Sequence, residues 1–147
     1  MEASIGFLGE FRHTVDEKGR LTLPARIRDQ LGASFVATKG LDGCLFFFTS
    51  PEWDAMEAAL TALPLTQKDA RDYTRAFFSS AAECHCDSQG RVLLPSALRA
   101  HARLEREGVV VGAGKRVEVW NPQAWDNYIS QVNAEIGSIA ERLGALR

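Results

Sequence analysis

The sequence predicts an α+β protein, mainly β with added helices, built from two copies of one unit of about 70 residues. The first observation is an internal repeat: residues 16–28 match residues 87–99 at a constant offset of 71. The second is a series of short β-type segments separated by glycine turns in both halves. The third is helical spacing of apolar residues after each of two expected hairpins. We therefore expect two similar halves that share one core.

Each unit is expected to begin with a strand, a tight turn and a return strand. An Asp side chain can accept a hydrogen bond from a backbone N–H two residues on, and glycine supplies a positive φ. The sequence Asp-x-x-Gly-Arg, which occurs at 16–20 and 87–91, is typical of such a turn, with Gly19 and Gly90 as turn-forming residues. The first strands are expected at 7–15 and 81–86, and the return strands at 21–23 and 92–94.

Short helices and hairpins follow in both halves. Pro24 and Pro95 suit the first position of helices near 25–31 and 96–103, and Gly32 suits the end of the first. The hairpin strands are expected at 35–38, 44–49, 109–111 and 116–120. Ser50-Pro51 and Asn121-Pro122 then indicate helix starts, with Ser50 and Asn121 as caps.

Three longer helices are predicted from apolar stripes. Pro64 separates the first two, and Thr66 is the expected cap of the second. The last stripe predicts one continuous C-terminal helix. The three stripes are Trp53, Met56, Leu60 and Leu63; Ala70, Tyr73 and Phe77; and Trp125, Ile129, Val132, Ile136, Ile139 and Leu143. The resulting division is a first repeat at 7–53, connecting helices at 54–80, a second repeat at 81–125 and a C-terminal helix at 126–147.

The charge distribution points to a polyanionic partner only when it is examined locally. The 147 residues carry a net charge of −2, which by itself argues weakly against nucleic acid. Residues 12–28 and 89–103, however, each carry a net charge of +3, and both contain a repeated turn. An Arg fixed at the end of a turn presents donors that suit phosphate or the O6/N7 edge of guanine. The alternative is a purely structural turn, with its Arg solvated or paired with its own Asp.

The repeated motifs resemble those of a known family. Residues 7–11 and 13–25 are FLGEF and HTVDEKGRLTLPA, and residues 77–84 and 87–95 are FFSSAAEC and DSQGRVLLP. In this order and separation they resemble the two motifs of MraZ proteins, and the match covers nearly the whole chain. MraZ proteins are similar to tandem copies of the SpoVT/AbrB-like swapped-hairpin fold. The resemblance therefore implies two such pseudo-repeats interleaved into one small β-barrel core with flanking helices.

The same resemblance implies a function and a set of site residues. The family is one of bacterial transcription regulators that bind short direct repeats in double-stranded DNA, upstream of the division and cell-wall gene cluster and their own promoter. Its members assemble as ring-shaped homo-oligomers. By position, the DNA-binding residues are Arg20, Lys18 and Asp16 in the first half, and Arg91, Gln89 and Asp87 in the second. Gln89 replaces the first motif's Lys, so the second motif is expected to contribute less charge. Local charge alone adds Arg12 and Arg26.

Other classes of function fit the sequence less well. Cys84 and Cys86 would share one face of a strand and His85 the other, so we expect core residues and no metal site. Phosphate loops, nucleophile elbows and paired carboxylates are missing from the sequence, so neither an enzyme, a cofactor nor a small-molecule substrate is expected. Phe46 to Phe48, Trp53, Trp120 and Trp125 are expected in the core or at subunit contacts. An AbrB-like antitoxin that binds a protein partner remains the alternative binding function.

The expected location is the cytoplasm, in association with the nucleoid. No apolar run approaches the roughly 18 residues of a membrane span, and the first residues lack the order of a signal peptide. Three cysteines, an odd number, fit a reducing compartment.

Overall fold

The computed structural model describes residues 5–144 and confirms the α+β fold class. Strands and helices follow one another in the same order in both halves of the chain. The strands are β1 (Glu10–Thr14), β2 (Arg20–Thr22), β3 (Phe35–Lys39), β4 (Leu45–Thr49), β5 (Ala82–Cys84), β6 (Arg91–Leu93), β7 (Glu107–Gly112) and β8 (Val117–Trp120). The helices are α1 (Ala25–Leu31), α2 (Ser50–Thr61), α3 (Lys68–Ser80), α4 (Ser96–His101), α5 (Pro122–Ala134) and α6 (Ile136–Leu143).

The two halves are interleaved strand by strand. The large sheet has the order β1-β7-β8-β4-β3-β5, and a second sheet consists of β2 and β6 alone. All pairs are antiparallel, and four of them join the halves: β1 with β7, β4 with β8, β3 with β5, and β2 with β6. Each half therefore depends on the other for hydrogen-bond partners along these strands.

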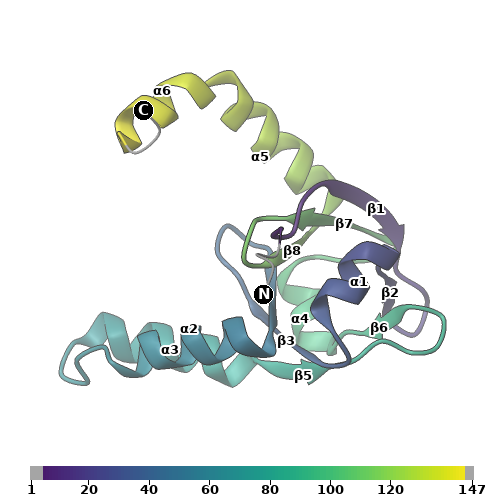
Figure 1. Cartoon of the computed structure of the whole chain (residues 1–147), viewed down its shortest axis with the longest axis horizontal. Helices are drawn as coiled ribbons and strands as arrows, with labels where there is room; N and C mark the ends of the chain where they lie inside the picture. The colour runs from purple at the N-terminus through teal and green to yellow at the C-terminus, as the bar shows by residue number, and fades with distance from the viewer. Residues whose placement is uncertain (1–4, 145–147) are drawn as a thin grey trace.

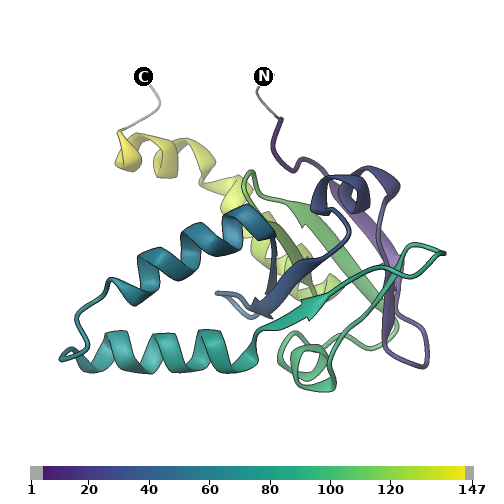
Figure 2. The same ribbon diagram turned by 60° about the horizontal axis from the view of Figure 1, so that its bottom comes forward.

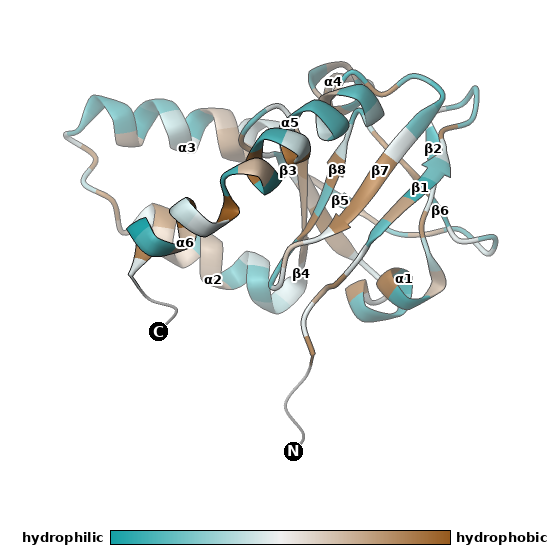
Figure 3. Ribbon diagram, turned by 90° about the horizontal axis from the view of Figure 1, so that it is seen from above, coloured by the Kyte–Doolittle hydropathy of each residue, from teal (hydrophilic) through white to brown (hydrophobic). Residues whose placement is uncertain are grey.

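The core lies on both faces of the large sheet, because alternate side chains of a strand point to opposite sides. On one face, Phe47 packs with Phe35, Ile27 of α1 and Leu98 of α4. On the other face lies an aromatic cluster covered by α2, α3 and α5. This cluster contains Phe46, Phe48, Phe77, Trp120 and Trp125, with Trp53, Met56 and Tyr73 packed against it. The aromatic residues are thus core residues, as predicted, and the apolar segments of β7 and β8 stand out in Figure 3.

The molecule has two distinct ends. The α2–α3 pair projects from one side of the sheet, whereas β2, β6 and α1 lie at the opposite side (Figure 1). Figure 2 shows the same separation after a rotation of 60°. No helix within residues 5–144 combines the length and apolar character needed to cross a membrane.

Four of the residues predicted at helix starts are displaced by one position. Thr49, not Ser50, caps α2, because its side-chain oxygen accepts a hydrogen bond from the Glu52 amide. Pro24 and Pro95 have extended ψ values and precede their helices instead of forming the first turn. Gln67, not Thr66, precedes α3, because the Gln67 amide donates to the Pro64 carbonyl and closes a turn that contains Thr66. Asn121 caps α5 and Gly32 ends α1, as predicted.

The C-terminal helix is not continuous, which corrects the prediction. Glu135 adopts φ −119° and separates α5 from α6. Trp125 is buried, but Ile136 and Leu143 are 59% and 68% exposed. Packing against the rest of the chain therefore does not keep α5 and α6 in one straight helix. An apolar stripe in the sequence predicts which side of a helix is apolar, but it does not predict that the helix is continuous. The end of the predicted range, 145–147, lies outside the described residues.

Candidate nucleic-acid interface

The first repeated turn is held by one carboxylate. Asp16 Oδ1 accepts hydrogen bonds from the backbone amides of Lys18 and Arg20, at 3.0 and 2.9 Å. Its Oδ2 accepts one from Arg20 Nε at 2.7 Å. Gly19 adopts φ +85° and its amide donates to the Asp16 carbonyl. The Asp-x-x-Gly-Arg segment therefore fixes both the backbone and the side chain of its own Arg.

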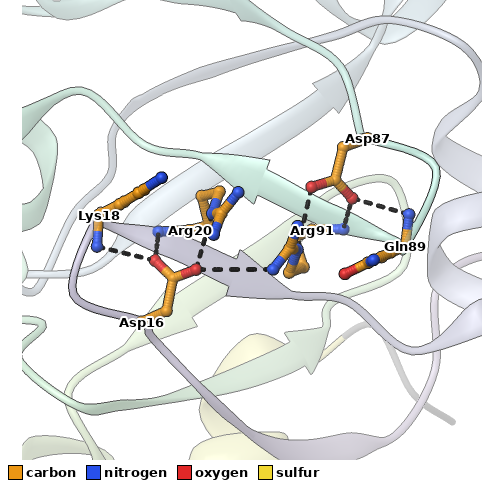
Figure 4. A network of polar contacts seen from close by, with 6 residues as sticks. All are labelled: Asp16, Lys18, Arg20, Asp87, Gln89 and Arg91. Carbon is orange, nitrogen blue, oxygen red and sulfur yellow. Dashed lines mark hydrogen bonds and ion pairs between the residues drawn. The ribbon is translucent and has the colours of Figure 1, made fainter.

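The second turn repeats this geometry. Asp87 Oδ1 accepts from the amides of Gln89 and Arg91, both at 2.9 Å, and Oδ2 accepts from Arg91 Nε at 2.9 Å. Gly90 adopts φ +78°. Figure 4 shows the two networks related by an approximate twofold, with Arg20 and Arg91 side by side between the two carboxylates. Arg91 Nη1 also approaches Asp16 Oδ2 at 3.9 Å, which links the halves.

Both carboxylates are ionised at neutral pH. The backbone amides of Arg20 and Arg91 donate to them and lower the pKa of Asp16 and of Asp87 below the ordinary value. A group with a lowered pKa contributes fully at pH values above its unfolded pKa, and the contribution is lost as the pH falls through the folded one. Both carboxylates therefore keep the negative charge with which they accept these hydrogen bonds at neutral pH.

The β2–β6 ribbon directs the two arginines outward. Leu21 and Val92 are directly opposite each other and fully buried in the core. Their neighbours Arg20 and Arg91 consequently point to the opposite face. Each keeps about a quarter to a third of its side chain exposed. Because the Nε of each arginine donates a hydrogen bond to the Asp of its own turn, the terminal Nη groups are the donors that can bind a ligand.

Each turn is also supported by the other half. The Leu94 amide donates to the Gly19 carbonyl at 3.1 Å, and the Leu23 amide donates to the Gly90 carbonyl at 3.0 Å. A Cβ atom at Gly19 would lie 2.5 Å from the guanidinium of Arg99, and one at Gly90 would overlap that of Arg28. Each glycine therefore has two roles. It adopts the positive φ that the turn needs, and its lack of a side chain leaves room for the guanidinium group of an arginine from the other half.

Alanine at Gly90 is expected to destabilise the protein by about 1–3 kcal/mol, the usual cost of a left-handed non-glycine residue, plus the cost of displacing Arg28. Gly114→Ala is the matched control, because Gly114 has φ +81° but open space around it. Urea unfolding of both variants measures their free energies of unfolding, and the difference between the two losses is the cost of displacing Arg28. Equal losses would show that the Arg28 contact contributes nothing.

The remaining predicted residues fall into two groups. Lys18 and Gln89 are exposed at the tips of the two turns, and Arg26 is exposed on α1. Arg12 instead pairs with Asp126 of α5 and with Glu10, so its charge is balanced within the chain. Sequence reasoning assigned no role to Arg28 and Arg99, although their identical places in the repeat were a signal for one.

The Cys84-His85-Cys86 segment is only partly a strand, because β5 ends at Cys84 and Cys86 forms an isolated antiparallel bridge with Val92. Cys84 is buried, Cys86 is partly buried and His85 is exposed. Burial raises the pKa of Cys84 to about 11 and that of Cys86 above its ordinary value, so both thiols are protonated at neutral pH. Among residues 5–144, no three His, Cys, Asp or Glu side chains are grouped to hold a metal ion.

Comparison with known proteins identifies the family. The model described as "MraZ protein, putative antitoxin-like" matches the chain twice, at residues 7–76 and 77–144. The chain belongs to the MraZ family. The two matches place one copy of the MraZ model on each half of the repeat.

Relatives confirm the membership along nearly the whole chain. The protein named "Transcriptional regulator MraZ" of Heliobacterium modesticaldum is 51% identical over 137 residues, which is 93% of this chain and 96% of the relative. The protein of the same name from Carboxydothermus hydrogenoformans shows the same identity and coverage. The one from Alkaliphilus oremlandii is 49% identical over 140 residues, which is 95% of this chain and 98% of the relative.

Proposed function

We propose that the chain is a sequence-specific DNA-binding transcription regulator that inserts the β2–β6 ribbon into the major groove. The observation that carries the proposal is the pair of outward arginines, Arg20 and Arg91, each oriented by its own carboxylate. The major groove of B-DNA admits a two-stranded β-ribbon. Terminal guanidinium nitrogens presented in this way match the O6 and N7 acceptors of guanine.

The surrounding residues then take supporting roles. Asp16 and Asp87 hold the turns, and Gly19 and Gly90 permit them. Lys18 and Gln89 at the turn tips and Arg26 on α1 contact phosphates, which position the ribbon without reading sequence. Arg12 contributes least, since Asp126 already neutralises it. The second motif adds less charge than the first because Gln89 replaces a lysine.

One ribbon reads too little sequence to locate a promoter alone. A bidentate contact supplies only about 1–3 kcal/mol of discrimination. We therefore infer that copies of the chain assemble as a ring-shaped homo-oligomer on short direct repeats upstream of the division and cell-wall gene cluster, including its own promoter. Tethered contacts then bind at a high effective concentration. The relatives' name as transcription regulators supports this role, in the cytoplasm and at the nucleoid, and neither catalysis nor a cofactor enters it.

The salt dependence of binding tests the proposal. Anisotropy of labelled upstream DNA is expected to report an affinity that falls tenfold or more between 50 and 200 mM salt, because several phosphate contacts release counterions. DNA of scrambled sequence and equal length is the control, and it should bind more weakly at every salt concentration. Failure to bind upstream DNA at 50 mM salt would contradict the proposal and favour the antitoxin-like alternative, in which a protein partner binds with little dependence on salt.

A further inference from the structure

One side chain on the outward face of the ribbon has no role in the fold. This face consists of Arg20, Thr22, Arg91 and Leu93, because the intervening Leu21 and Val92 point into the core. Leu93 is 59% exposed. Its chain neighbours, Val92 and Leu94, are buried. Leu93 therefore contributes little to the core, and its strand position calls for a polar or charged residue.

The position of Leu93 is set by the same register that places the arginines. Leu93 lies directly opposite Arg20 in the β2–β6 pair, and Thr22 lies directly opposite Arg91. Opposite residues on one face have Cβ atoms about 4.5–5.5 Å apart, comparable with one or two base-pair steps. Leu93 therefore lies beside the base of the Arg20 side chain, on the same outward face of the ribbon.

The two halves of the repeat carry different residues at the position of this leucine. Thr22 and Leu93 occupy equivalent positions at the offset of 71, but one is hydroxylated and half-buried whereas the other is apolar and exposed. The two ends of the ribbon therefore present different chemistry beside equivalent arginines. A ribbon of this kind distinguishes the two directions of a DNA site.

We propose that Leu93 is a specificity-determining residue that contacts the 5-methyl group of a thymine beside the guanine read by Arg20. This inference rests on the proposed function. The thymine methyl is the apolar feature of the major-groove edge, and apolar side chains recognise it there. The leucine also disfavours the amino group of cytosine or adenine at that position, which would lose its hydrogen bond to water against an apolar surface.

Deoxyuridine in place of single thymines in the upstream DNA tests the contact, because it removes the methyl group and leaves base pairing unchanged. Wild-type protein is expected to lose about three- to fivefold in affinity at one thymine per repeat, the contribution of one buried methyl group. Leu93→Thr, which copies the residue of the first half, should show a smaller loss than wild type, because its shorter side chain with a single methyl group makes less contact with the thymine methyl. Leu65→Thr is the matched control, since Leu65 is 81% exposed at the α2–α3 connection, away from the ribbon.

The outcomes separate this inference from the proposed function. If wild type binds no upstream DNA, the proposed function itself fails, and this inference fails with it. If Leu93→Thr binds with the same sensitivity to deoxyuridine as wild type, Leu93 does not read the thymine although the ribbon binds DNA. Native mass spectrometry of both variants accompanies the titrations. Loss of assembly by Leu93→Thr with an unchanged base preference would also overturn the inference, because it would place Leu93 at a subunit contact.

Discussion

Replacing Arg20 by alanine is expected to weaken binding to the upstream DNA by about 5- to 150-fold for each motif that must engage, since one bidentate contact supplies about 1–3 kcal/mol. The loss is larger when several copies bind together, because the change affects every subunit of the assembly. The substitution also leaves Asp16 without its Nε donor, although the amides of Lys18 and Arg20 still hold the turn. Anisotropy titrations measure the affinity, and circular dichroism verifies the fold.

Arg75→Ala is the matched control for this prediction. Arg75 is an exposed arginine on α3, at the end of the molecule opposite the ribbon, so its removal lowers the net charge equally. Arg91→Ala should give a smaller loss than Arg20→Ala, because the second turn carries Gln89 where the first carries Lys18. Binding by the assembled Arg20→Ala protein at the wild-type affinity would remove the ribbon from the DNA contact.

Replacing Phe47 by alanine is expected to lower the free energy of unfolding by about 3–5 kcal/mol. Phe47 is completely buried and its ring lies 5.1 Å from that of Phe35. Its strand, β4, pairs with β3 of its own half and with β8 of the other. The cavity therefore weakens both halves, and the melting temperature should fall by roughly 6–20 °C in one transition.

Leu41→Ala, at a site that is 55% exposed, is the control and should change the stability by less than about 1 kcal/mol. Calorimetry and circular dichroism should give coincident transitions for both variants. A Phe47→Ala protein that melted in two separated steps would show that the halves are independent units, contrary to the interleaved sheet.

Local features of the fold could be predicted from the sequence, because they depend on neighbouring residues. The two turns, both hairpins and the caps at Asn121 and Gly32 are of this kind. The spacing of Asp, Gly and Arg in the Asp-x-x-Gly-Arg motif determines the turns, because the Asp side chain accepts a hydrogen bond from the amide of the Arg four residues later. The pairing of the halves was predicted only through the family resemblance, since no local pattern specifies that β1 joins β7.

Contacts between distant residues were the ones that local reasoning missed. Local charge suggested Arg12 as a DNA contact, but its partner Asp126 lies 114 residues away. The contacts of Arg28 with Gly90 and of Arg99 with Gly19 also form only when both halves are folded together. The break at Glu135 was missed because an apolar stripe continues through it. These features depend on tertiary packing, which residue spacing does not encode.

Hydrogen–deuterium exchange of the full-length protein, with and without its upstream DNA, tests the central claim most directly. DNA is expected to slow exchange in the segments 16–22 and 87–93 and to leave exchange in α3 unchanged. The turn-tip amides of Lys18 and Gln89, bonded only to local carboxylates, are the most informative. Protection confined to α3 or to the α5–α6 segment, with none at the two turns, would contradict the assignment of the β2–β6 ribbon as the DNA-binding surface.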